Sequence, residues 1–186
     1  MDSLSKGNKA ATGQTPKTQP APIKPQTAPG SLQQVFPDLY CTLKLTAKRT
    51  ENRCGEMTYS PLTVQQGTVL KEVTSELIGC GSHIFTIFSF EWEVTIGNKG
   101  LVDTNGPPDG AVHVVTSIAT GGGPPTQLGN SVIPKLPEEG HFPLKYSRPV
   151  SALPAGPITV TTTITYKGQE VSKENNVCIH QFTLQK

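Results

Sequence analysis

The sequence lacks any run of about 18 uninterrupted apolar residues, so we expect no membrane-spanning helix. Its first residues, MDSLSKGNKAATGQT, are polar throughout and have no apolar stretch of the kind that a secretory signal contains. The formal net charge is only +2, and no Arg-rich run is present, so the charge gives no support for a nucleic-acid partner, and none is expected. Aromatic residues are few, and no window shows the pattern of a long amphipathic helix. The abundance of glycine and proline instead favours an all-β sandwich or barrel.

The chain divides by composition into a tail and a domain. Residues 1–34 contain five prolines and four lysines but no aromatic residue. Such a segment buries too little apolar area to offset its ordering entropy, so we predict a disordered tail. The folded domain is predicted over residues 35–186.

Strands are predicted wherever β-branched and aromatic residues alternate between turn residues. The clearest case is Ile158–Tyr166, in which the even-numbered residues form one face and four threonines form the other. The stretch GGGPP at residues 121–125 is predicted to open a flexible polar linker of about fifteen residues. The predicted strands are Tyr40–Thr46, Glu56–Tyr59, Val69–Ile78, Ile84–Ile96, Ala111–Ala119, His141–Tyr146, Ile158–Tyr166 and Val177–Leu184.

No residue pattern supports catalysis or a resident metal or cofactor. The four histidines have no zinc-ligand spacing, and no HExxH motif occurs. Glu91 and Glu93 lie on one face of a strand, which is typical of a solvated surface. The four cysteines fit either two disulfides in an oxidising compartment or free thiols in the cytosol. We therefore expect a protein that is not an enzyme.

The strand Ile84–Ile96 carries the densest apolar pattern of the chain. Period-two alternation predicts that one face holds Ile84, Phe88, Phe90, Trp92, Val94 and Ile96. That face is interpreted in two ways: as the packed centre of a sandwich, or as the lining of a cavity for an apolar ligand. The spacing of the residues does not separate these alternatives.

Several short motifs resemble those of the ML-domain family of lipid-recognition proteins. The C-terminal part has Pro137, Gly140, Phe142 and Leu144, then a strand that starts after Pro154 and Gly156, and finally Cys178-Ile179. Upstream, Tyr40-Cys41 and the segment SPLTVQQG at residues 60–67 are similar to the opening cysteine of the family and the segment that follows it. Leu136 stands where the family usually has a cysteine. The resemblance covers residues 40–184.

The resemblance implies an immunoglobulin-like β-sandwich of two antiparallel sheets that binds and transfers or presents a phospholipid, glycolipid or sterol between the sheets. It implies disulfides between Cys41 and Cys178 and between Cys54 and Cys80. It also implies a secreted or endolysosomal setting, with membranes or a protein receptor as further partners. The residues expected to contact the lipid are Ile84, Phe88, Phe90, Trp92 and Val94, with Val114, Ile118, Phe142, Val160 and Ile164 as the opposite walls.

Two alternatives stay open. An intracellular β-sandwich that binds a prenyl anchor would explain the missing signal and would place the chain in the cytoplasm with free thiols. A small viral coat protein with a jelly-roll fold would also combine a flexible arm with eight strands. The arm has few lysines for genome packaging, which weighs against this second alternative.

Overall fold

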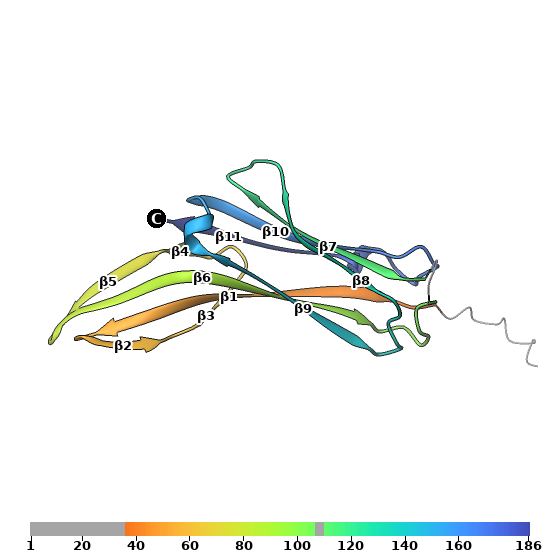
Figure 1. Ribbon diagram of the computed structural model, residues 1–186, viewed down its shortest axis with the longest axis horizontal. Helices are drawn as coiled ribbons and strands as arrows, with labels where there is room; N and C mark the ends of the chain where they lie inside the picture. The colour runs from red at the N-terminus through yellow and green to blue at the C-terminus, as the bar shows by residue number, and fades with distance from the viewer. Residues whose placement is uncertain (1–35, 107–109) are drawn as a thin grey trace, which may run out of the picture. The chain divides into compact units, whose positions relative to one another are not determined.

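The computed structural model describes residues 36–106 and 110–186. The chain divides into two units, Met1–Gln33 and Gln34–Lys186. The predicted tail lies outside the described residues, and the description below concerns the second unit. Two β-sheets make up this unit and face each other, as Figure 1 shows.

The first sheet, sheet A, is built around the two longest strands, which pair antiparallel along almost their whole length. These are β1 (Leu39–Arg53) and β6 (Gly81–Asn98). β2 (Glu56–Tyr59) and β3 (Leu62–Val64) pair with β1, whereas β5 (Val73–Ile78) and β9 (His141–Pro149) pair with β6.

The second sheet, sheet B, has the strand order β4-β11-β10-β7-β8. Its strands are β4 (Val69–Lys71), β7 (Val112–Thr120), β8 (Thr126–Ile133), β10 (Gly156–Thr165) and β11 (Val177–Gln185). Two short 3₁₀ helices, η1 (Val150–Ala152) and η2 (Glu174–Asn176), lead into β10 and β11 respectively. The fold is therefore an all-β, immunoglobulin-like sandwich, as predicted, with the single difference that β4 pairs parallel to β11.

All eight predicted strands are present, although the segment Val69–Ile78 is split at Glu72, where the chain passes from sheet B to sheet A. Two strands were missed. The predicted flexible linker after GGGPP contains β8, which pairs antiparallel with β7. β3 occupies three residues of the segment that was compared with the ML-domain motif. β3 has only three residues, and β8 contains Gly129 and Asn130, which are depleted in strands. Pairing with β1 and with β7 respectively holds these two segments extended.

The core consists of two apolar clusters between the sheets. One contains Phe90, Trp92, Ile118, Val160 and Phe182, and the other contains Val94, Ile96, Val114, Ile133 and Ile164. Each cluster draws residues from both sheets, so the sheets are packed together along the sandwich. Phe90 and Phe182 lie with their ring centroids 5.0 Å apart across the interface.

A β-bulge interrupts the predicted aromatic face of β6. Lys48 pairs with Ser89 and Arg49 pairs with Ile87, so Phe88 is the extra residue on β6. The bulge exchanges the two faces: Ile87 is buried in the core, whereas Phe88 is 44% exposed and lies near Tyr59 on the outer surface. The prediction that Phe88 shares the face of Phe90 and Trp92 is therefore wrong.

A buried asparagine closes the end of the sandwich where β6 finishes. The Oδ1 atom of Asn98 accepts hydrogen bonds from the backbone N–H groups of Asp38 and Gly100, each at 3.0 Å. Its Nδ2 atom donates to the carbonyl oxygens of Val102 at 2.8 Å and Pro137 at 3.1 Å. One amide thus connects the start of β1 with two loops, which explains why a fully buried polar side chain is tolerated there.

Candidate functional site

Most of the residues predicted to contact a lipid are packed in the core. Ile84 is an exception: it is half-buried and lies with Ser75 of β5 on the outer face of sheet A, because the bulge at Phe88 separates it from Phe90. The prediction that Ile84 shares the face of Phe90 and Trp92 is therefore wrong. The buried members of the predicted set are Phe90, Trp92, Val94, Val114, Ile118, Val160 and Ile164. They contact one another within the two core clusters.

Phe142 does not lie on the opposite wall, contrary to the prediction. It is a residue of β9 and pairs with Ile96, so it belongs to the same sheet as the aromatic strand. It is also 40% exposed, because β9 is an outer strand of sheet A. The sequence pattern identified β9 as a strand but carried no information on which sheet it would join.

Among the described residues, several buried polar atoms have no hydrogen-bond partner, and two of them lie side by side. These two are Nε1 of Trp92 and the hydroxyl oxygen of Tyr146, and the two residues pair directly across β6 and β9. A buried N–H or O–H without a partner costs free energy, so each such group calls for an explanation. At this pair, a guest molecule with a hydrogen-bond acceptor would find two donors, one of them on Trp92 of the predicted lining.

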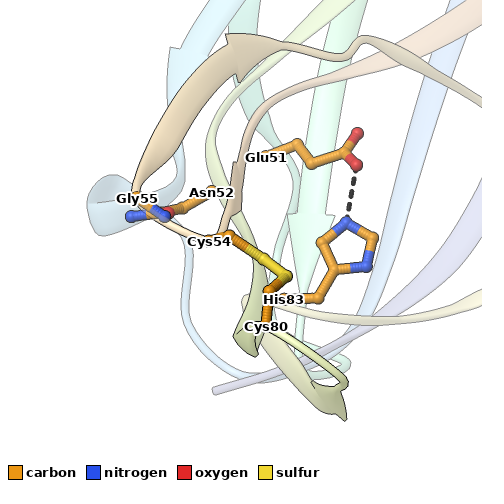
Figure 2. The surroundings of a disulfide bond; sticks show 6 residues. All are labelled: Glu51, Asn52, Cys54, Gly55, Cys80 and His83. Atoms are coloured by element: carbon orange, nitrogen blue, oxygen red, sulfur yellow. Dashed lines mark hydrogen bonds and ion pairs between the residues drawn. A yellow bond between two sulfur atoms is a disulfide. The ribbon is translucent and has the colours of Figure 1, made fainter.

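The disulfide predicted between Cys54 and Cys80 is present (Figure 2). β1 and β6 are neighbours, so the turn after β1 and the turn before β6 lie at the same end of sheet A. The two cysteines occupy these turns and connect them. Beside them, Nε2 of His83 and Oε1 of Glu51 are 2.6 Å apart, a hydrogen-bond contact that the sequence did not predict.

Cys41 and Cys178 are thiols in the structure rather than a disulfide. They nevertheless interact, because β1 and β11 bring them together from opposite sheets. The hydrogen bond between the thiols, together with burial, raises the pKa of Cys41 far above its ordinary value. The same hydrogen bond lowers the pKa of Cys178. The bond implied by the family resemblance is therefore absent, but its two ends are adjacent.

The remaining histidines and acidic residues form no cluster and lie at separate surface or core positions. His141 contacts the hydroxyl group of Tyr40 at 3.1 Å, and His180 is buried with a pKa lowered by that burial. Glu91 and Glu93 face solvent and pair with lysines, as predicted for a solvated face. Within residues 36–106 and 110–186, no group of three or more His, Cys, Asp and Glu side chains is arranged to hold a metal ion. Among the same residues, no helix is long and apolar enough to span a membrane.

The four main strands of sheet B contain no charged residue. β7, β8, β10 and β11 together lack Asp, Glu, Lys and Arg. The inward residues of these strands form the core, and the outward residues form a continuous face, which we call the threonine face. Its members are His113, Val115, Ser117, Asn130, Val132, Thr159, Thr161, Thr163, Thr165, Val177 and Ile179.

The strand register places hydroxyl and aliphatic groups in rows across this face. Thr163 lies between Val177 on β11 and Val115 on β7. Thr161 in the same way lies between Ile179 and Ser117. These valines and the isoleucine are each about half-exposed, so the face presents aliphatic groups to solvent as well as hydroxyls. Behind it, the hydroxyl groups of Thr116 and Thr162 are hydrogen-bonded at 2.9 Å within the core.

The outer face of sheet A has the opposite character. Nζ of Lys48 lies 2.7 Å from Oε2 of Glu91, and the Lys145 ammonium lies 3.5 Å from the carboxylate of Glu93. The hydrogen bond from Lys48 holds the pKa of Glu91 below its usual range. Cross-strand charge pairs of this kind are typical of a face that remains in water. The two sheets of one domain thus expose surfaces of different chemistry.

The sequence analysis noted the alternation of threonines in β10 but did not identify the threonine face. The signal that would have revealed it is the absence of charge from four separate strand segments, which is unusual in a chain with 16% charged residues. The uncharged strands can be recognised as one surface only when the strand order is known, because β7 and β11 flank β10 in space and not in sequence.

Comparisons with known proteins add little beyond the fold. No protein-family model and no curated protein matches the chain. Among solved structures, the chain is similar to the CARDB domain of the PF1109 protein from Pyrococcus furiosus in complex with di-metal ions. That likeness has 15% identity and a TM-score of 0.48 and covers 81% of this chain and 90% of the other.

Two further structures are more distant. A β-glucosidase from Erythrobacter marinus has 10% identity and a TM-score of 0.36, and the match covers 78% of this chain and 16% of the enzyme. The N-terminal domain of PorA has 10% identity and a TM-score of 0.29, over 74% of this chain and 97% of that domain. None of these likenesses bears on lipid binding, anchor binding or coat assembly.

Proposed function

We propose that the protein is a non-catalytic recognition module that binds another protein through the threonine face. The observation that carries this proposal is the complete absence of charged residues from β7, β8, β10 and β11. Depletion of charge is a property of the centre of protein–protein interfaces. The exposed Val115, Val177 and Ile179 add apolar area to this face, and apolar area gathered on one surface is a feature of protein interaction sites.

The chemistry of the face limits the class of partner. Without cations, the face offers nothing to neutralise phosphates, which argues against a nucleic acid. Its threonine and serine hydroxyls require hydrogen-bond partners when they lose water, and the interior of a lipid bilayer supplies none. A protein surface with its own uncharged polar and aliphatic groups, such as the face of another sheet, satisfies both the hydroxyls and the exposed valines.

The proposal is tested first by site-specific cross-linking. A photo-reactive amino acid is placed at Thr161, in the middle of the face, and at Thr42, an exposed position on the outer face of sheet A. In extracts of the native source we expect one reproducible partner cross-linked from position 161 and not from position 42. Equal labelling from both positions, or none from position 161, would contradict the proposal.

The identified partner is then purified and its affinity is measured. Thr161→Lys places an unpaired charge in the centre of the face and should weaken binding by roughly 10-fold to 100-fold. Thr42→Lys is the matched control and should leave affinity unchanged. Both variants should keep the melting temperature of the parent protein, because both side chains point away from the core. Unaltered affinity in Thr161→Lys would exclude the threonine face as the binding surface.

Lipid binding between the sheets, predicted from the family resemblance, is a second candidate. It is favoured by Trp92 and Tyr146, whose buried Nε1 and hydroxyl groups lack partners. A lipid carrying a hydrogen-bond acceptor would satisfy them if the packed sheets separated locally. Native mass spectrometry of the purified protein, beside a solvent extract, tests this candidate. Detection of about one lipid molecule per chain, together with altered emission of Trp92, would support lipid binding. A protein that contains no lipid and also fails to take up added phospholipid or sterol would exclude it.

A further inference from the structure

Strand β5 is an outer strand of sheet A. The strand order β2-β1-β6-β5 places it at one end, and its ladder partner is β6. Figure 1 shows β5 as the last strand on its side of the sheet. An outer strand presents backbone N–H and C=O groups that another strand can pair with, and proteins commonly protect such edges with charge or proline. β5 has neither on its outward face, since its residues there are Val73, Ser75 and Leu77.

The hydrogen-bond pattern shows which backbone groups of β5 point to the free edge. The N–H of Ile87 donates to the carbonyl oxygen of Glu72 at 2.8 Å, and this bond fixes the alternation along the ladder. Thr74 and Glu76 therefore direct their backbone groups toward β6. Val73, Ser75 and Leu77 direct theirs away from β6, and no backbone partner for them occurs in the described part of the chain.

The same three residues have their side chains on the outer face of sheet A. Val73 pairs with Thr86 and Ser75 with Ile84, on the face that also bears Tyr59 and Phe88. Leu77 is 91% exposed and Val73 is 54% exposed. The free edge and the exposed aliphatic side chains thus belong to the same residues, so a strand added at this edge would cover both.

We propose that β5 pairs antiparallel with β5 of a second copy of this chain, about a two-fold axis at Ser75. In this register Ser75 faces Ser75 of the partner subunit, and Val73 faces Leu77 of the partner subunit. Each residue whose backbone groups point to the free edge then faces a residue of the same kind in the partner subunit. This arrangement allows an uninterrupted series of backbone hydrogen bonds between the two strands. The two most exposed aliphatic side chains of the edge pack against each other across the interface.

Electrostatics favour this register over the neighbouring one. With the axis at Ser75, Glu76 faces Thr74 of the partner subunit, an uncharged residue. With the axis moved to Glu76, Ser75 would face Leu77 of the partner subunit, and the two glutamates would face each other as a closely spaced, non-hydrogen-bonded pair. The like charges disfavour that arrangement. The charge of Glu76 therefore favours the register with the two-fold axis at Ser75.

The test uses paired charges in the full-length chain. Because Ser75 faces its own copy, Ser75→Lys alone and Ser75→Glu alone each place like charges on the two-fold axis, and each variant should be monomeric in sedimentation velocity. An equimolar mixture should restore the dimer, since opposite charges then meet. Ser147→Lys, on β9, which is another outer strand of sheet A, is the matched control and should remain dimeric like the parent protein. A monomeric parent protein at concentrations up to hundreds of micromolar, or Ser75 variants that stay dimeric alone, would overturn the proposal.

Hydrogen exchange gives a second readout that does not depend on how the variants fold. In the parent protein, the amides of Val73, Ser75 and Leu77 should exchange rapidly in dilute solution and slow down as concentration rises. The amides of Thr74 and Glu76 bond to β6 and should be protected at every concentration. If exchange at the three edge amides does not depend on protein concentration, the pairing with a second copy is excluded. This outcome includes the case in which a foreign peptide occupies the edge in place of a second copy.

Discussion

The thiol of Cys41 donates across the two sheets to the carbonyl oxygen of Thr162 at 3.9 Å, and Thr162 is the residue that pairs with Cys178 on the neighbouring strand. Cys41 lies on β1 in sheet A and Cys178 lies on β11 in sheet B, so the pair sits at the interface of the sandwich. Thr162 lies beside Cys178 on β10, and its side chain helps to lower the pKa of the Cys178 thiol. A lowered thiol pKa favours the thiolate, which is the form that attacks oxidants and disulfides.

We predict that mild oxidation converts this pair into a disulfide. The two thiols would lose two electrons and two protons to added oxidised glutathione, which is reduced to two thiols. Since the bond closes a loop of over 100 residues, the chain-entropy model gives about 4 to 5 kcal/mol of stabilisation. Peptide mapping without reduction should find Cys41 joined to Cys178, together with a higher melting temperature. Cys178→Ser should show no gain on oxidation, and mixed glutathione adducts on both cysteines in the parent protein would contradict the prediction.

The predictions from sequence succeeded where period-two alternation was uninterrupted. In β10, Ile158, Val160 and Ile164 are buried and the four alternate threonines face outward, as predicted. The same reasoning failed in β6, where Phe88 is an extra residue opposite β1. A bulge of this kind is set by the register of two long strands, which the pattern of one strand does not reveal. The sequence pattern also did not reveal which strand each strand would pair with. Phe142 is an example, because its strand β9 pairs with β6 and so belongs to the same sheet as Ile96.

The bulge leads to a prediction about two phenylalanines two residues apart. Phe88→Ser should cost less than about 1 kcal/mol of unfolding free energy, because the side chain lies half-exposed on the outer face. Phe90→Ser should cost roughly 3 to 5 kcal/mol, because the ring is fully buried between Trp92 and Phe182. Urea unfolding of both variants measures the difference. Equal losses would show that Phe88 is a core residue and that the faces of β6 do not exchange.

Asn98 is expected to be among the most sensitive polar positions. Asn98→Ala leaves two backbone N–H groups and at least two carbonyl oxygens without partners in a buried site, which should cost roughly 2 to 4 kcal/mol. Asn98→Asp keeps the shape and the acceptor but replaces the donating amide with an oxygen that faces carbonyl oxygens. We therefore expect Asn98→Asp to be destabilised as well, and less so at a pH low enough to protonate the new carboxylate. Equal stability of Asn98→Asp and the parent protein at pH 7 would contradict this account.

The last prediction concerns the pH dependence that His180 imparts to stability. His180 is buried on the inner face of β11, its Nε2 has no hydrogen-bond partner, and burial lowers its pKa. In the unfolded chain its pKa is near 6.5, so between that value and the lower folded pKa the unfolded state binds more protons. Stability is thus complete above about pH 7.5 and declines as the pH falls through 6.5 toward the folded pKa.

Replacing the imidazole with an apolar side chain isolates this contribution. His180→Leu removes the titrating group and should flatten the pH profile of the unfolding free energy between pH 8 and pH 5.5. His113→Leu is the matched control, because His113 lies exposed on the threonine face and should leave the profile unchanged. Urea unfolding at several pH values measures all three proteins. If the parent protein and His180→Leu lose stability in parallel as the pH falls, His180 is not held neutral by the fold, and the acid sensitivity has to be assigned to other groups.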